Sequence, residues 1–377
     1  MTAHRLLLIG GGHAHVQVLR ALAERPEPGL SVTLATDRLL TPYSGMLPGH
    51  VAGFYGRADM HIDLARLSRV CGVSLIPSAA TAIDRNARRV LFEDGGVADY
   101  DTLSLNIGVT PDLSGVVGAE RHAVAVKPIS GFLDRLDTLL AEAERPDGPR
   151  RFLLVGGGAA GVELALAITA RLRAFNPSGR PFWVGLASAG DLVATLNAGV
   201  RRRVRAALAR RDVTVLDGFR AVEVTADGVR AQDGRFTQAD AVLISTDARA
   251  PAWLQKTGLP VDPAGFLLTN RDLSCIGEPA IFAVGDCGTV AEDPRPKAGV
   301  FAVRQGPALT ENLRRRARGA PLAPHQPDQK FLAILMTGDG SAIAGRGDWL
   351  ALEGEWVWRW KDWIDRRFMR RFSEFRR

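Results

Sequence analysis

The chain has 377 residues, enough for two or three domains, and its 46% hydrophobic and 24% charged residues are typical of a soluble globular protein. The net charge of +7 is concentrated in residues 359–377, which carry eight basic and three acidic side chains. Because the remainder is nearly balanced, the composition argues against a nucleic-acid-binding protein. The sequence has no secretory signal and no uninterrupted run of 18 apolar residues, so we expect a cytoplasmic protein without a membrane-spanning helix.

The first predicted element is a strand that runs into three glycines and a helical pattern, "HRLLLIGGGHAHVQVLRALA" at 4–23. Glycines at such a turn let a pyrophosphate approach the backbone N–H groups and the positive end of the helix dipole. The turn reads Gly10-x-Gly12-x-x-His15, with a histidine where a third glycine is usual. That third position normally serves close helix–strand packing, so His15 predicts altered packing more than lost nucleotide binding.

The second predicted strand, "VTLATD", ends in Thr36 and Asp37. An acid that binds a ribose hydroxyl is expected about 20 residues after the glycine turn, so either side chain fits this role. A simple turn at the end of the strand is the alternative.

The motif is repeated at 150–169 as "RRFLLVGGGAAGVELALAIT", with the complete pattern Gly156-x-Gly158-x-x-Gly161. One such motif is a weak signal, but two copies, each between a strand and a helix, predict two bound dinucleotides. Electrons are then expected to pass from one to the other. Ser188 stands where the ribose acid of this copy should be, so NADH and NADPH are not distinguished.

Further apolar segments predict strands whose carboxyl ends also face a ligand. One of them, at 100–111, ends in Gly108, and another, "AIFAVGDCGTV" at 280–290, brings Gly285 and Asp286 to its end. An acid at this position can accept hydrogen bonds from sugar or ribityl hydroxyls, and the glycine lets the backbone approach the ligand.

The order of these motifs resembles the two-dinucleotide flavoproteins of the pyridine nucleotide-disulfide oxidoreductase superfamily, from residue 4 to about 320. Four segments are similar to a narrower group, the type II NADH dehydrogenase-like proteins and the flavoprotein module fused to selenide, water dikinase. These segments are "GGGHAHVQVLR", "TPYSGMLPG", "RPKAGVFAVRQGPALTENLR" and "WVWRWKDWIDRRFMRRF". The resemblance implies an α/β fold with two Rossmann-like dinucleotide-binding domains, for FAD and NAD(P), and a small C-terminal region. The expected bounds are 1–115 and 247–325 for the two parts of the FAD domain, 116–246 for the NAD(P) domain and 326–377 for the C-terminal region.

Motifs and resemblance together assign residues to the two cofactors, FAD and NAD(P)H. Those assigned to FAD are Gly10, Gly12, His13, His15, Thr36, Asp37, Pro42, Tyr43, Gly108, Gly285, Asp286 and Lys297. Those assigned to NAD(P)H are Gly156, Gly158, Gly161 and Glu163. The resemblance places the loop "TPYSGMLPG" over the flavin, with Tyr43 and Met46 as wall residues; loop architecture alone is the alternative. The pair His13-x-His15 is expected to contact FAD or to pack, and no metal site is predicted.

Hydride transfer from a nicotinamide to a flavin needs stacked rings and little else, because the cofactors carry the chemistry. A helix predicted to begin at Pro296–Lys297 would place its N-terminus near the ring, and we expect Lys297 to stabilise charge on the reduced flavin. A solvated lysine at a helix start is the alternative.

The cysteines narrow the choice among related flavoproteins. Cys71, Cys275 and Cys287 form no CxxxxC pair, which argues against disulfide reductase activity, and they do not match the cysteines that sulfide:quinone oxidoreductases need. Cys287 follows Asp286 and lies either near the flavin or in the core as a small residue. The predicted function is an FAD-dependent NAD(P)H oxidoreductase that passes electrons to a quinone-like acceptor. The alternatives are a sulfur- or selenium-linked flavoprotein such as a sulfide:quinone oxidoreductase-like enzyme, and a non-enzymatic protein that senses flavin and nucleotide.

The last predicted element is a basic amphipathic helix in "EWVWRWKDWIDRRFMRRFSEFRR". Its apolar face is expected to contain Trp356, Trp360, Trp363, Ile364, Phe368 and Phe375. Its basic face is expected to contain Arg359, Arg366, Arg370 and Arg377. Helices of this composition bind membrane surfaces, which predicts peripheral attachment at the inner face of the membrane. Packing against the FAD domain or against a partner in a homodimer is the alternative.

Overall fold

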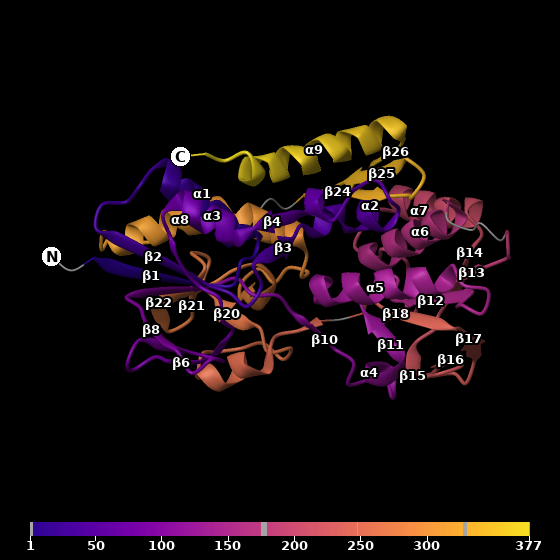
Figure 1. Ribbon diagram of the computed structural model, residues 1–377, viewed down its shortest axis with the longest axis horizontal. Coiled ribbons are helices and arrows are strands. Elements are labelled where there is room, and N and C mark those ends of the chain that lie inside the picture. The colour runs from indigo at the N-terminus through magenta and orange to yellow at the C-terminus, as the bar shows by residue number, and fades with distance from the viewer. Residues whose placement is uncertain (1–2, 175–178, 247, 327–329, 377) are drawn as a thin grey trace.

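The computed structural model describes residues 3–174, 179–246, 248–326 and 330–376, so Arg377 lies outside the described residues. Two sheets stand side by side in Figure 1, and the long C-terminal helix α9 (Glu355–Ser373) lies along the top of both. This arrangement confirms the expected α/β fold with two Rossmann-like units and a small C-terminal region.

The first sheet has the strand order β23-β20-β21-β22-β9-β1-β2-β5. The bounds are β1 (His4–Ile9), β2 (Leu30–Ala35), β5 (Ser74–Ile76), β9 (Thr102–Leu105), β20 (Leu267–Thr269), β21 (Ser274–Cys275), β22 (Glu278–Ala283) and β23 (Gly288–Val290). Strands β22, β9, β1, β2 and β5 run parallel, and a parallel sheet is covered on both faces, which explains the continuous apolar runs of the sequence. Helices α1 (His13–Glu24), α3 (Leu64–Cys71) and α8 (Gly299–Ala317) cover one face. The sheet of β6 (Ala80–Asp84), β7 (Arg89–Phe92) and β8 (Val97–Asp99) covers the other.

The second sheet is entirely parallel, with the order β11-β18-β12-β13-β14. Its bounds are β11 (Ala123–Ala125), β12 (Arg151–Val155), β13 (Trp183–Ser188), β14 (Val213–Asp217) and β18 (Ala241–Ile244). One face packs on helices α5 (Ile129–Ala143), α6 (Ala159–Ala174) and α7 (Ala198–Arg210). The other packs on the antiparallel sheet of β15 (Ala221–Thr225), β16 (Gly228–Ala231) and β17 (Phe236–Gln238).

The chain passes between the two sheets twice, and the two crossing segments pair with each other as β10 (Thr110–Pro111) and β19 (Ala248–Arg249). Among the described residues, the shorter elements are β3 (Leu40–Pro42) with β4 (His61–Asp63), α2 (Leu47–Val51), α4 (Ala119–His122), and 3₁₀ turns at Ser44–Met46, Ala58–Met60, Ala252–Thr257 and Gly285–Cys287. The first crossing therefore separates the two glycine turns, so that each turn belongs to its own sheet.

The C-terminal region consists of the antiparallel sheet β24 (Leu332–Met336), β25 (Ala342–Arg346) and β26 (Leu350–Gly354), followed by α9. Only part of the predicted apolar face of α9 packs on the protein: Phe368 is buried, but Trp356 and Trp363 are 55% and 51% exposed. The buried residues of the helix are Val357, Trp358, Lys361, Asp365, Phe368, Met369 and Phe372. Lys361 and Asp365 can lie inside because they form an ion pair of 2.6 Å one turn apart, an arrangement that hydrophobic periodicity does not reveal.

Candidate dinucleotide and redox site

The first glycine turn joins the carboxyl end of β1 to the N-terminus of α1. Gly10 has φ +87°, and an ideal Cβ there would lie 2.6 Å from the carbonyl oxygen of Asn106. Within the part of the chain that the structure describes, the N–H groups of Gly11 and His13 have no hydrogen-bond acceptor. Free N–H groups at a helix N-terminus are what a pyrophosphate needs, so the turn fits the expected FAD.

Asn106 contacts this turn but was not among the site residues predicted from the sequence. It follows β9, and its Oδ1 accepts hydrogen bonds from the N–H groups of Ala14 (3.0 Å) and His15 (3.2 Å), while its Nδ2 donates to the carbonyl of Val284 (3.1 Å). The side chain therefore caps α1 and ties it to the end of β22. A polar residue directly after a buried strand was the only local signal for this role.

The structure corrects the assignment of His15 to the cofactor. The ring is fully buried; Nδ1 donates to the carbonyl of Gly10 (2.7 Å) and Nε2 accepts from the hydroxyl of Ser104 (2.8 Å). Burial lowers the pKa of His15 to about 4. The histidine thus replaces the usual glycine by bridging the helix to β1 and β9, and no surface of the ring is left for a ligand.

Thr36 and Asp37 lie at the carboxyl end of β2, beside the glycine turn, because β1 and β2 run parallel in register. Thr36 is buried and its hydroxyl is engaged with the backbone of Arg38. The carboxylate of Asp37 is exposed and lies 3.6 Å from the guanidinium of Arg38. Of the two, Asp37 is therefore the side chain that a ribose can reach, and its role stays a prediction.

The loop at residues 41–49 lies against the first glycine turn. His13 Nε2 lies 3.2 Å from the carbonyl of Pro42, and the Tyr43 ring stacks on Phe368 of α9 with centroids 4.7 Å apart. A Cβ on Gly299, the first residue of α8, would lie 2.6 Å from Ser44 Oγ. The loop, the start of α8 and the inner face of α9 therefore meet at one place. Met46 does not line it: that side chain is 1% exposed and packs in the core, which corrects its expected place in the wall.

Gly285 and Asp286 follow β22 and approach the same place from the first sheet. Gly285 has φ +67° and donates its N–H to Gln305 of α8 (2.6 Å). The Asp286 carboxylate is bonded to Lys127 Nζ (2.8 Å), a residue of the second unit that the sequence did not single out. Gly108 is exposed, and a Cβ there would meet nothing within 4 Å, so its presence is not required by packing.

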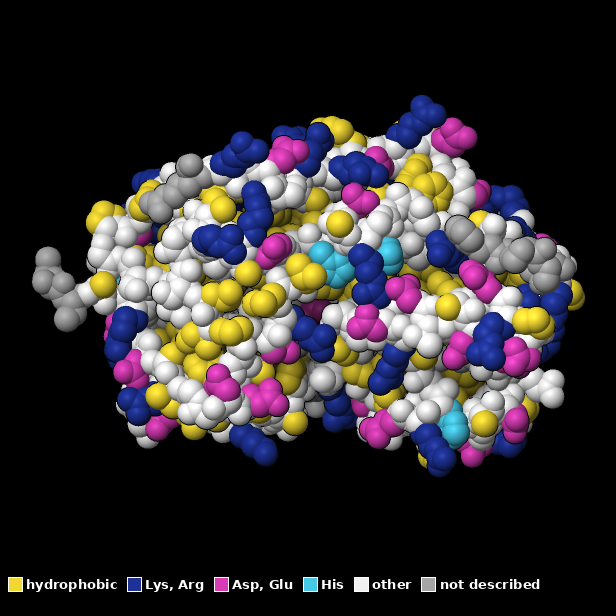
Figure 2. Space-filling view, in the orientation of Figure 1, with side chains coloured by type: hydrophobic (Ala, Val, Ile, Leu, Met, Phe, Trp, Pro, Cys, Tyr) yellow, Lys and Arg dark blue, Asp and Glu magenta, His cyan; other side chains and the backbone are white. Residues whose placement is uncertain are grey.

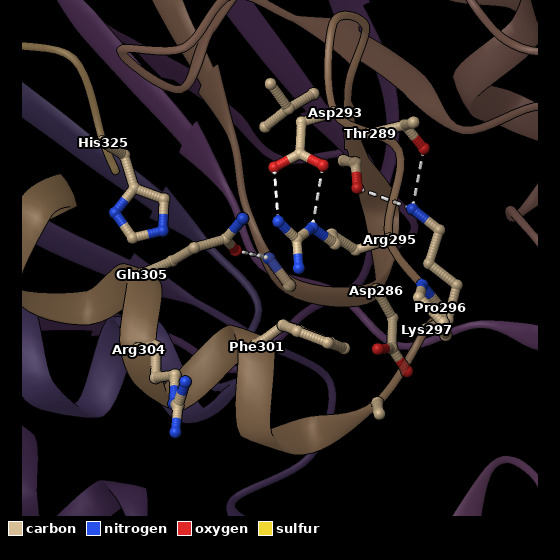
Figure 3. Close-up of a pocket in the computed structure, with 14 residues that line it drawn as sticks. Asp286, Thr289, Asp293, Arg295, Pro296, Lys297, Phe301, Arg304, Gln305 and His325 are labelled. Carbon is tan, nitrogen blue, oxygen red and sulfur yellow. Dashed lines mark hydrogen bonds and ion pairs between the residues drawn. The ribbon is translucent and has the colours of Figure 1, made fainter. Parts of the chain in front are cut away.

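Lys297 lines the cavity beside Asp286, as Figure 3 shows, but its ammonium is already occupied. Nζ donates to the carbonyl of Gly288 (2.6 Å) and to Thr289 (2.7 Å), and lies 4.2 Å from the centre of the Phe266 ring. Helix α8 begins at Gly299, two residues later than expected, so Lys297 precedes it. Its role as a charge at the flavin stays a prediction.

The second glycine turn joins β12 to α6. A Cβ on Gly161 would overlap the carbonyl oxygen of Gly156, so this glycine allows the helix to pack on the strand. Gly158 is exposed, and a Cβ at that position would meet nothing within 4 Å. Unlike α1, α6 has no side chain among the described residues that caps its first turn. Its open N-terminus fits a dinucleotide phosphate.

No acid stands at the end of β13. Ser188 is buried and donates its hydroxyl to the carbonyl of Gly190 (2.7 Å), and Asp191 is paired with Arg201 (2.8 Å). The choice between NADH and NADPH therefore stays open.

A cluster of charged side chains lies where α6, the loop at 41–49 and α9 meet. Glu163 Oε1 accepts the N–H of Met336 (2.8 Å), and Lys361 Nζ donates to Asp365 (2.6 Å) and to the carbonyl of Gly45 (2.6 Å). Burial raises the pKa of Glu163 to about 7, although the positive charge of Lys361 opposes this shift. Burial, together with the Asp365 carboxylate, also raises the pKa of Tyr43. Glu163 is thus turned toward α9 and β24, and its contact with NAD(P)H stays a prediction.

The three cysteines are buried and form no disulfide with one another. The thiol of Cys287 donates to the carbonyls of Leu105 and Val284 (3.3 Å each), and burial raises its pKa to about 11. A thiol in this state is not a nucleophile at neutral pH. The structure therefore favours the interpretation of Cys287 as a small core residue.

Known proteins match along most of the chain. The family model of the pyridine nucleotide-disulphide oxidoreductases matches residues 4–306. A demethylphylloquinone reductase of Synechocystis is 25% identical over 387 residues, covering 95% of this chain and 93% of that protein. A type II NADH:quinone oxidoreductase of Staphylococcus epidermidis is 23% identical and covers 84% of this chain and 83% of its own. Among solved structures, the fold is similar to that of the sulfide:quinone oxidoreductase of Aquifex aeolicus, with a TM-score of 0.82 and 19% identity over 98% of this chain and 92% of that chain. It is also similar to that of NDH2 of Plasmodium falciparum, with a TM-score of 0.80 and 13% identity over 97% of this chain and 98% of that chain.

Proposed function

The chain belongs to the pyridine nucleotide-disulphide oxidoreductase family, and we propose that it is an FAD-dependent NAD(P)H oxidoreductase that reduces a quinone-type acceptor. The observation that carries the proposal is the pair of glycine turns with free N–H groups, one in each of the two main sheets, at the carboxyl ends of β1 and β12. No disulfide is present among the described residues. FAD and NAD(P)H are its cofactors, with FAD at the first turn and NAD(P)H at the second. The names of the relatives from Synechocystis and Staphylococcus support a quinone as acceptor.

The bound cofactors supply the hydride and electron transfer, and the chain supplies their positions. Gly11 and His13 would donate backbone N–H groups to the pyrophosphate of FAD, and Asp286 would accept from its hydroxyls. The start of α8, with no side-chain cap, directs the positive end of its dipole toward Ser44 and His13, where it favours negative charge. The stacked rings of Tyr43 and Phe368 would cover the region between the start of α8 and the loop at residues 41–49 and exclude water from it.

Reduction of a quinone to a quinol consumes two protons, and we place their last protein carriers in the cluster of Glu163, Lys361 and Asp365. With its pKa raised to about 7, the Glu163 carboxyl can both hold and release a proton at neutral pH. Lys361 and Asp365 fix the charge next to it through their 2.6 Å ion pair. The cluster belongs to α6 and α9, so it lies between the NAD(P)H half and the C-terminal helix.

The fold is similar to that of the sulfide:quinone oxidoreductase of Aquifex aeolicus. This similarity of fold does not make sulfide oxidation the favoured activity of this chain. The alternative considered from the sequence, an enzyme that oxidises sulfide, would need reactive cysteines. The described cysteines are buried, and burial holds the pKa values of the Cys275 and Cys287 thiols above their ordinary range.

Anaerobic mixing tests the main proposal. Purified protein with bound flavin is mixed with NADH or NADPH, and the flavin absorbance is followed before and after a soluble quinone is added. We expect bleaching by at least one nucleotide and recovery on addition of quinone. No bleaching with either nucleotide would refute the proposal, and bleaching by sulfide but by neither nucleotide would favour the rival.

The finer proposals concern domain bounds and the membrane. We propose that residues 1–115 and 247–325 form the FAD domain, 116–246 the NAD(P) domain and 326–377 the C-terminal region.

None of the described helices is long and apolar enough to cross a membrane. We further propose that α9 attaches to a membrane surface from outside. In support, Figure 2 shows several Lys and Arg side chains along the edge where Figure 1 places α9, and Trp356 and Trp363 are exposed there.

A further inference from the structure

An ion pair between Lys127 and Asp286 lies at the edge of the cavity beside the first glycine turn. Their Nζ and Oδ2 atoms lie 2.8 Å apart, and the two side chains are only 35% and 20% exposed. Oδ1, the other carboxylate oxygen of Asp286, has no hydrogen bond to any residue that the structure describes. Figure 3 shows this carboxylate at the edge of the cavity. One oxygen is therefore held by the protein, and the other is available to a hydroxyl donor.

The two partners come from different units of the molecule. Asp286 follows β22 in the first sheet, while Lys127 lies between β11 and α5 beside the second. The N–H of Val126 donates to the carbonyl of Ile244 (2.9 Å), so the residue before Lys127 is fixed to the second sheet. The lysine therefore reaches across from the second unit to the first.

Lys127 is the cation in direct contact with Asp286 among the described residues. Lys297 also lies near, but its Nζ is bonded to Gly288 and Thr289. His13 faces Asp286 as well, but burial lowers its pKa, so that its ring is uncharged at neutral pH. Removal of Lys127 would therefore leave a partly buried carboxylate without its compensating charge.

We propose that Lys127 is a positioning residue for FAD: its ammonium holds Oδ2 of Asp286 so that Oδ1 accepts a hydrogen bond from a cofactor hydroxyl. Its positive charge also offsets the carboxylate next to a group that must accept electrons. This inference rests on the proposed FAD site and adds to it a residue from the opposite unit. The role expected from the sequence for Lys297, a charge at the flavin, stays a separate prediction.

The test is FAD binding to the apo forms of the full chain, followed by fluorescence quenching, together with the midpoint potential of the bound flavin. We expect Lys127→Met to weaken FAD binding about tenfold and to shift the potential to a more negative value, because a positive charge is lost. Lys127→Arg keeps the charge and should restore both quantities in large part. The matched control is Lys330→Met, which removes a lysine from an ion pair with Asp348 outside the site.

A double-mutant cycle with Asp286→Asn separates a positioning role from general loss of stability. If Lys127 acts through Asp286, the double variant binds FAD no more weakly than Asp286→Asn alone. Fully additive losses, or a Lys127→Met protein with wild-type affinity and potential, would overturn the inference while leaving the proposed function intact. A wild-type chain that takes up no FAD would instead refute the proposed function, and this inference with it. Thermal melting of each apo variant identifies any form that has failed to fold.

Discussion

Oδ1 of Asn106 accepts a hydrogen bond from the N–H of Ala14, 92 residues away in the sequence, at 3.0 Å. This bond caps the helix that follows the first glycine turn. Through Nδ2 and Val284 the same side chain also fixes the strand that carries Asp286. One residue thus aligns two of the segments assigned to FAD.

Asn106→Ala should lower the free energy of unfolding by about 2 kcal/mol, because a helix cap and a buried hydrogen bond are both lost. It should also weaken FAD binding, since the glycine turn would no longer be aligned with β22. Asn197 is a matched control: it caps α7 in the same way, by accepting from Val200 N–H (3.0 Å), but lies outside the first turn. We expect Asn197→Ala to reduce stability in urea denaturation without changing FAD affinity. Equal losses of FAD affinity in both variants would contradict the proposed role of Asn106.

His15 should make the stability of the protein depend on pH. Because burial lowers its pKa to about 4 from the ordinary 6.5, the unfolded chain binds a proton first as the pH falls. The stabilisation is therefore complete above pH 6.5 and is lost between pH 6.5 and 4, by roughly 3 kcal/mol. Urea denaturation at several pH values should show this slope in the wild type and in the control His61→Gln, but a smaller slope in His15→Gln. Parallel curves for all three proteins would exclude the effect.

The glycines of the second turn should separate binding from packing. At Gly158 a Cβ meets no protein atom, so Gly158→Ala should leave the melting temperature unchanged while it raises the KM for NAD(P)H about tenfold by holding the phosphate away. At Gly161 a Cβ would overlap the Gly156 carbonyl, so Gly161→Ala should cost about 1–3 kcal/mol of stability. Steady-state kinetics and thermal melting on both variants check the contrast. An unaltered KM for Gly158→Ala would place the nucleotide elsewhere.

Glu163 should set the pH dependence of quinone reduction. With its pKa raised to about 7, the carboxyl is protonated below this pH and loses its proton above it, so the wild-type rate should fall as the pH rises past 7. Glu163→Gln should remove this dependence and slow quinone reduction by about a hundredfold. Stopped-flow measurement of flavin reoxidation by quinone isolates this half-reaction. Glu353→Gln, which changes a glutamate paired with Arg210, should retain the wild-type profile. A pH profile that Glu163→Gln leaves intact would assign the protons to other groups.

The outer face of α9 should decide membrane binding. Deletion of the helix is a poor test, because Phe368 and Phe372 are part of the core. Replacement of the exposed Trp356 and Trp363 by serine leaves that core in place. The variant should sediment with anionic vesicles roughly tenfold more weakly than the wild type, and neither protein should bind well to zwitterionic vesicles. A wild-type chain that does not sediment with anionic vesicles would reject the membrane proposal and favour packing as the only role of α9.

The repeated glycine turns were predictable from the sequence, because each depends on residues that are neighbours in the chain. The apolar runs of β1 and β12, the glycines that follow and the helical spacing of α1 and α6 all lie within about 20 residues. The carboxyl-end position of Asp286 was predictable for the same reason. Local spacing also determined that two dinucleotide sites share one chain.

Tertiary structure alone decided which side chains surround these turns. Asn106 reaches α1 because β9 pairs with β1, and Lys127 reaches Asp286 because the second sheet lies beside the first. His15 was assigned to the cofactor for its position in the sequence, but its hydrogen bond to Ser104 directs the ring to the protein itself. The buried side of α9 was predicted only in part, because a buried Lys361–Asp365 pair looks like surface charge in the sequence. The free energy of such contacts depends on which distant segments meet, and the spacing of residues along the chain does not determine which segments these are.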